Sequence, residues 1–276
     1  IILIILGDVM GVPVGDLFKA ALLPGGVLVG AFIIYVLAVS FFKPSSAPAL
    51  PANEAAGHGV QPCWNAFKAI APPLSLMVAV LGSIFYGIAT PTESSAIGGV
   101  GAILLSIIYR QFSWSIIYEA ALETVKVTAM VFAIFIGATA FSMVFSYTGG
   151  EEVIEEVMTS LPGEKWGFLI LTMLVILVLG FFIDFVEISF IVVPMLYPVA
   201  DILGIDLAWF AILIAMNLQT SFLTPPFGFS LFYLKGVAPP QVQTMDIYKG
   251  VIPFISLQIL VLISILLFPE FYGFTP

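Results

Sequence analysis

The sequence predicts an all-α membrane protein, a polytopic bundle of transmembrane helices. Of its 276 residues, 61% are hydrophobic and only 9% are charged, and the mean hydropathy is +1.16. A soluble domain carries about 25% charged residues, whereas membrane helices need runs of about 20 mainly apolar residues. The net charge of −9 also argues against nucleic-acid binding. We therefore expect the chain to lie in a lipid bilayer.

Seven apolar segments are candidates for membrane helices. They span residues 21–42, 66–89, 95–109, 125–147, 166–199, 208–234 and 248–268. The second and third are predicted to be two crossings joined by a turn at Thr90–Ser95. The fifth exceeds one crossing of roughly 20 residues and contains Asp184 and Glu187. We therefore expect it to be two helices joined by a non-helical link.

Polar stretches connect these segments. Residues 43–65 are rich in Pro, Ala and Ser, which predicts a loop, and the single Cys and single His lie there. Residues 112–124 suit a helix at the membrane interface, and 149–165 predict an acidic surface helix or loop. The positive-inside rule places the basic loops on either side of 66–109 in the cytoplasm and the acidic stretch outside.

A polar cluster with two prolines interrupts the sixth apolar segment. It comprises Asn217, Gln219, Thr220, Ser221, Thr224, Pro225, Pro226 and Gly228. The prolines lack a backbone N–H, so the helix must open there, and open backbone at membrane depth needs protein or a water-filled cavity around it. Its amide, hydroxyl and carbonyl oxygens suit a hard cation such as Na⁺. The alternative is a structural kink whose Ser and Thr side chains bond back to the chain.

A second polar group comprises Thr90, Pro91, Thr92 and Glu93. Pro91 suits the first turn of a helix, with Thr90 as N-cap and the Glu93 carboxylate near the helix N-terminus. Capping explains Thr90 and Glu93 without any ligand. The alternative is that this helix start lines an ion or substrate site.

Asp184 and Glu187 form the third polar group, within the segment 166–199. They are three residues apart and share a face if the link is helical. Ionisable residues inside a membrane segment indicate function by default. The segment 166–199 contains no Lys, Arg or His that could pair with these two carboxylates. A bound cation, a proton or polar contacts from other helices would then satisfy them. The alternative is that both residues lie near the membrane interface. A catalytic role for the pair is disfavoured, because the apolar segments contain neither a His nor a Gly-x-Ser-x-Gly motif.

Two short stretches of the chain resemble each other. Asp16 to Pro24 is similar to Asp246 to Pro253, and each follows an apolar run and a link containing Gly or Pro. Duplicated halves are common in secondary transporters. We expect a second proline-containing break before Ile1 if the duplication is real. The chain begins within an apolar run and without Met, so we also expect it to be the C-terminal part of a longer protein.

Several of these motifs together resemble one known family. Gly87 to Ala96, Asn217 to Pro239, Gly15 to Gly25, and Asp184 with Pro194 and Pro198 are similar to the large membrane subunit (DctM-type) of TRAP transporters, the tripartite ATP-independent periplasmic transporters. The resemblance covers nearly the whole chain, except for residues 43–62.

The resemblance implies an elevator-type, Na⁺-coupled importer of carboxylates in a bacterial or archaeal cytoplasmic membrane, built from inverted repeats with re-entrant hairpins and broken helices, and not an enzyme. Residues 1–42 would end the first repeat, 43–65 form a loop, and 66–276 form the second repeat with a hairpin at 208–236. No cofactor is implied, and Na⁺ as the coupling ion would bind near Thr220, Thr224 and Gly228.

The implied partners are a small membrane subunit and a periplasmic substrate-binding protein that delivers the solute. One alternative is a Na⁺- or H⁺-coupled dicarboxylate transporter that needs no binding protein. Another is a membrane scaffold without transport activity, which would not need three polar breaks.

Overall fold

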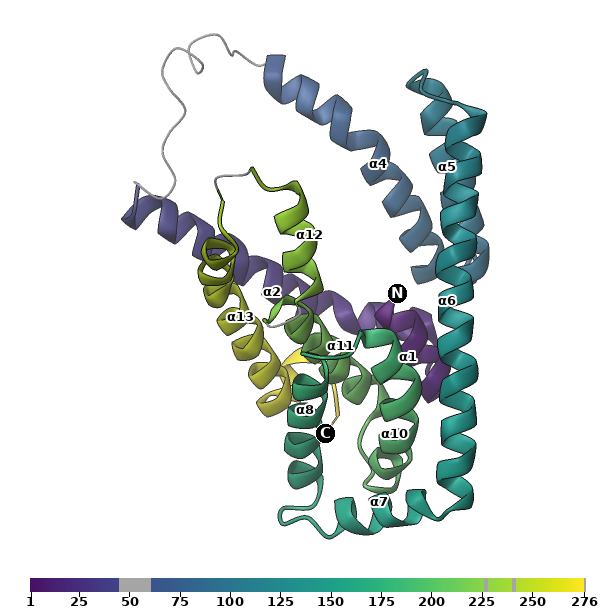
Figure 1. Ribbon diagram of the computed structural model, residues 1–276. Coiled ribbons are helices and arrows are strands. Elements are labelled where there is room, and N and C mark those ends of the chain that lie inside the picture. Colours follow the sequence, from purple (N-terminus) through teal and green to yellow (C-terminus); the bar gives the residue numbers. More distant parts are fainter. Residues whose placement is uncertain (45–60, 226–227, 240–241, 276) are drawn as a thin grey trace. The chain divides into compact units, whose positions relative to one another are not determined.

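The computed structural model describes residues 1–44, 61–225, 228–239 and 242–275 (Figure 1). Within these ranges all regular secondary structure is helical, as the sequence predicts. The chain divides into two compact units, of which unit 1 comprises residues 1–32 and 126–276 and unit 2 comprises residues 33–125. We describe each unit by itself.

Unit 1 contains most of the helices. They are α1 (Ile2–Met10), the first part of α2 (Val14–Phe42), the second part of α6 (Trp114–Tyr147), α7 (Gly150–Thr159), α8 (Lys165–Leu179), α9 (Phe185–Glu187), the π-helical turn η1 (Ile188–Val192), α10 (Val193–Ile202), α11 (Leu207–Leu223), α12 (Phe229–Val237), α13 (Thr244–Leu267) and the 3₁₀ turn η2 (Pro269–Tyr272).

Helix α11 is the core of unit 1. All residues from Trp209 to Ile214 are buried, and the helix packs against α1, α8, α10, α12 and α13. Asp206 caps its start, because its Oδ1 accepts a hydrogen bond of 2.9 Å from the Trp209 backbone N–H. Residues 207–216 of this helix are apolar on all sides, which suits such a central position.

The long segment 166–199 is two helical pieces, which confirms the prediction. Helix α8 ends at Leu179, and the chain becomes helical again at Phe185 after Asp184, whose extended backbone and side chain cap the new helix. The π turn η1 ends just before Pro194. Because Pro194 has no N–H, it cannot bond the carbonyl four residues earlier, which loosens the regular α-helical pattern there.

Unit 2 contains the rest of α2, α4 (Gln61–Phe85), α5 (Pro91–Ile108) and the start of α6. Helices α4 and α5 pack against each other. Gly101 allows a close approach, since a Cβ there would lie 2.3 Å from Leu76 Cδ1. The buried Ser94 shares a hydrogen bond of 2.7 Å with Ser83 across the pair.

Among the described residues, six helices are long and apolar enough to cross a membrane. They are Val14–Phe42, Ala66–Phe85, Pro91–Ile108, Trp114–Tyr147, Phe185–Ile202 and Thr244–Leu267. Large apolar side chains are widely exposed on these helices, which suits contact with lipid. Helices α8 and α11 are shorter, at 15 and 17 residues.

Several predicted boundaries were wrong. The predicted loop 43–65 ends early, because α4 begins at Gln61, and residues 45–60 lie outside the described ranges. The turn predicted at Thr90–Ser95 lies at 86–90. The predicted interfacial helix 112–124 continues into the next segment as α6, because neither Gly nor Pro interrupts the chain there. The acidic stretch 149–165 contains a helix, α7, without buried residues, which is one of the two predicted alternatives.

Candidate functional site

The break between α11 and α12 lies where the prolines predict it. Helix α11 ends at Leu223, and Thr224 leaves the helix with extended backbone angles of φ −98° and ψ 131°. Gly228 starts α12 with φ +36°, a left-handed conformation that favours glycine. A Cβ at Gly228 would lie 3.3 Å from the Thr224 carbonyl oxygen, so the chain folds closely on itself. The predicted Pro226 lies outside the described residues.

The hydroxyl groups near the break bond back to their own helix, as the kink alternative predicts. Thr220 donates to the Met216 carbonyl at 2.8 Å, and Thr224 donates to the Thr220 carbonyl at 2.8 Å. Ser221 donates to the Leu218 carbonyl at 2.9 Å. A hydroxyl that donates its proton keeps lone pairs that can accept. These bonds therefore fix the oxygen positions without excluding a cation.

Asn217 of α11 is fully buried, and its side chain faces α8. Its Nδ2 donates to the carbonyl of Met173, and no described residue donates to its Oδ1. Burying an amide oxygen without a partner costs stability. Buried polar groups in native proteins are almost always satisfied, so this orphan oxygen indicates a ligand or an ordered water.

The break after α8 lies beside the end of α11. Besides the Asn217–Met173 bond, the Phe185 and Phe222 rings meet edge-on at 6.4 Å between centroids. Gly180 faces Ser221 so closely that a Cβ at Gly180 would lie 2.6 Å from Ser221 Cβ. The structure thus brings together two of the three predicted polar groups.

Asp184 lies just before the helix as its N-cap, and Glu187 occupies the third helical position, so the two carboxylates lie on the same side and close to each other. Glu187 is in the first turn, with a buried Oε2 that has no partner among the described residues. The hydroxyl of Ser189, in the π turn, is also buried and unpartnered there. π turns of this kind are frequent at functional sites.

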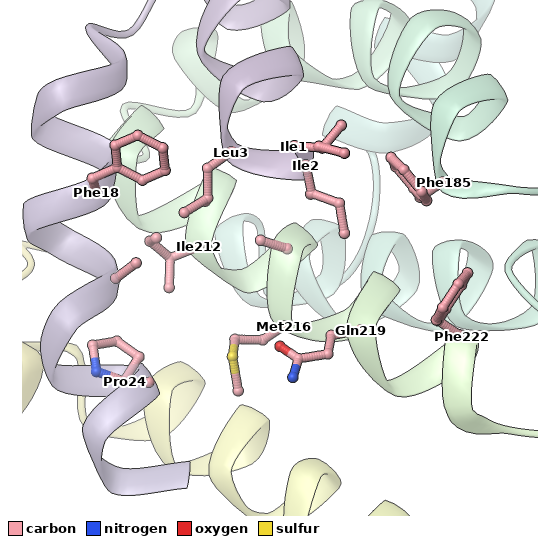
Figure 2. A pocket seen from close by; sticks show the side chains of 13 residues that line it. Ile1, Ile2, Leu3, Phe18, Pro24, Phe185, Ile212, Met216, Gln219 and Phe222 are labelled. Carbon is pink, nitrogen blue, oxygen red and sulfur yellow. The ribbon is translucent and has the colours of Figure 1, made fainter. Parts of the chain in front are cut away.

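A cavity of about 400 Å³ lies next to Gln219. Figure 2 shows Gln219 beside Met216 among mainly apolar side chains of α1, α2 and α11. Gln219 is itself exposed. It therefore lies on a different face of α11 from the buried Asn217.

The group at Thr90 belongs to unit 2 and forms a capping box. Glu93 Oε2 accepts from the Thr90 backbone N–H at 2.8 Å, and Thr90 Oγ1 accepts from the Glu93 backbone N–H at 3.3 Å. Pro91 occupies the first helical position, and the Thr92 carbonyl accepts from Ser95. Capping therefore explains the side chains of Thr90 and Glu93.

Besides Ser189, sequence reasoning missed two buried polar residues of unit 1. Thr172 in α8 and Gln258 in α13 each have a buried side-chain oxygen without a described partner. The sequence contained a signal for Gln258, because Val251 and Ile265, seven residues away on either side, are apolar. A single amide side chain in the apolar stripe of a membrane helix indicates a functional residue.

Membrane-length helices, two interrupted helices and buried polar oxygens beside both breaks define a polytopic helical membrane protein. The profile of the family described as "Tripartite ATP-independent periplasmic transporter, DctM component" matches residues 1–271. The chain belongs to this family.

Curated relatives agree with this assignment. The chain is 31% identical to the C4-dicarboxylate TRAP transporter large permease protein of Rhodobacter capsulatus, over 85% of the chain and 52% of the relative. It is 27% identical to the sialic acid TRAP transporter permease of Haemophilus influenzae, over 100% and 44%. It is 28% identical to the ectoine TRAP transporter large permease of Halomonas elongata, over 97% and 61%. The chain thus spans about half the length of these relatives, which are named as transporter permeases and not as enzymes.

Proposed function

We propose that this chain is the C-terminal part of the large permease of a TRAP-type secondary transporter, and that it couples Na⁺ entry to uptake of a carboxylate-type solute. The observation that carries the proposal is the meeting of two helix breaks in unit 1. Gly180 contacts Ser221 there, and the nearby Asn217 has a buried, unpartnered oxygen. Paired breaks of this kind hold ions in other secondary transporters.

The Na⁺ site is proposed at the end of α11, near Thr220, Thr224 and Gly228. The Thr224 side chain is fixed by its bond to the Thr220 carbonyl, and the backbone opens at Thr224. The C-terminal end of a helix carries partial negative charge, which favours a cation. Hydroxyl and carbonyl oxygens are ligands of the kind that hard cations prefer.

The whole transporter is proposed to lie in a bacterial or archaeal cytoplasmic membrane. It would work with a small membrane subunit and a periplasmic binding protein that delivers the solute. The relatives are named for C4-dicarboxylates, sialic acid and ectoine, which supports an organic acid as the solute. The elevator motion and the hairpin at 208–236 remain predictions.

Proteoliposome uptake tests this proposal. The full-length permease, with its small subunit, is reconstituted and supplied with binding protein loaded with a labelled C4-dicarboxylate. We expect uptake under an inward Na⁺ gradient and little uptake when K⁺ replaces Na⁺. Equal uptake in the two salts would reject Na⁺ coupling. Uptake of free solute without the binding protein would favour the binding-protein-independent transporter, and no substrate-dependent ion flux would favour a scaffold.

A further inference from the structure

Gln258 is a polar residue on an otherwise apolar face of α13. Its side chain is 3% exposed, and its Oε1 has no partner among the described residues. Val251 and Ile265 lie two turns before and after it and are both buried, so all three share one face. A buried amide oxygen without a donor costs stability, and nothing in the packing of that face explains it.

Two contacts place Gln258 along α11. Trp209 Nε1, near the start of α11, donates to the Ile265 carbonyl, near the end of α13, at 3.1 Å. At the opposite ends of the helices, Leu223 packs on the cluster that contains Val251. The two helices are therefore antiparallel.

This antiparallel register places Gln258 level with Met216. A shift of seven residues along each helix from the Trp209–Ile265 contact leads to this pair. The carbonyl of Met216 accepts the hydrogen bond of Thr220, and Thr220 is fully buried. The unpartnered amide oxygen of Gln258 thus lies across from the last two turns of α11 before the break.

We propose that Gln258 Oε1 is a further ligand of the cation site at Thr220, contributed by α13. The proposal rests on the Na⁺ site described above and extends it to a third helix. A neutral amide oxygen suits a monovalent cation held by hydroxyl and carbonyl oxygens. It also explains why this polar group lies on a face where an apolar side chain would pack without cost.

The test compares Gln258→Leu with wild type in the full-length permease and its small subunit. Leu has a similar size and removes the buried amide. Because a bound ligand stabilises the folded state, the midpoint of thermal unfolding is measured against NaCl concentration, with choline chloride at constant ionic strength. We expect Gln258→Leu to be as stable as wild type or more stable in choline chloride. Its half-saturating Na⁺ concentration should rise about tenfold or more.

Ser256→Ala is the matched control, because Ser256 is exposed on α13 and bonds only to the Ile252 carbonyl at 3.0 Å. Its Na⁺ response should equal that of wild type. An unchanged Na⁺ response in Gln258→Leu, beside a clear response in wild type, overturns the assignment of Gln258 alone. A wild-type protein without any Na⁺ response overturns the proposed Na⁺ site and this ligand with it.

Discussion

The close contact between Gly180 and Ser221 predicts a clash that can be tested. In Gly180→Ala the new Cβ would lie 2.6 Å from Ser221 Cβ and 2.2 Å from its Oγ, whereas ordinary contacts begin at 3.4 Å. The hydroxyl can rotate away, but the Cβ is fixed by the backbone of α11. The ends of α8 and α11 must therefore separate by several tenths of an ångström. Overpacking of this kind costs about 1–3 kcal/mol of the free energy of unfolding.

The assay is thermal unfolding of the full-length protein in detergent, as a double-mutant cycle with Ser221. Ser221→Gly removes the obstructing Cβ and should restore most of the stability lost in Gly180→Ala, once its own helix cost of about 1 kcal/mol is subtracted. Ser221→Ala keeps the Cβ and should not. Gly250→Ala is the control, because a Cβ there has open space. Wild-type stability of Gly180→Ala, or equal rescue by the Ala and Gly variants, would refute the proposed contact.

Three further substitutions test other local features by thermal unfolding. Thr90→Val removes the hydroxyl that accepts from the Glu93 N–H and should cost about 1 kcal/mol; no loss would argue against the capping box. Gly228→Ala forces a side chain into φ +36° and should cost about 1 kcal/mol or more; a neutral result would contradict that backbone conformation. Trp209→Phe loses the bond to the Ile265 carbonyl and should cost about 1 kcal/mol, and an unchanged unfolding midpoint would remove the anchor that sets the register of α11 on α13.

The two breaks could be predicted from sequence because local chemistry decides them. Proline lacks an N–H, so the end of α11 near Pro225 is readable directly from the chain. The split after α8 follows from the length of the apolar segment and from Asp184, which favours a cap. The sequence did not predict that the helix at 112–124 continues as α6 to Tyr147. A composition typical of the membrane interface is also compatible with a helix that continues into the membrane.

The pairing of the breaks could not be derived from periodicity. Residues 207–216 of α11 are apolar around the whole circumference of the helix, so their sequence does not indicate which side meets α8 and which meets α13. The contact of Gly180 with Ser221 joins residues 41 positions apart and depends on packing alone. The sequence shows the polar residues Asn217 and Gln258, but only the structure shows that their side-chain oxygens are buried without a described partner. Only the tertiary structure therefore shows which of the predicted polar residues are neighbours.

The most direct measurement is the Na⁺ dependence of uptake in proteoliposomes for the double variant Thr224→Ala, Pro225→Ala. The variant removes one proposed oxygen ligand and one of the two prolines of the break, with Gly250→Ala as the control. We expect the half-saturating Na⁺ concentration to rise at least about tenfold, or uptake to be lost, while the protein stays folded. Wild-type uptake with a wild-type Na⁺ response would contradict a coupling site at the end of α11.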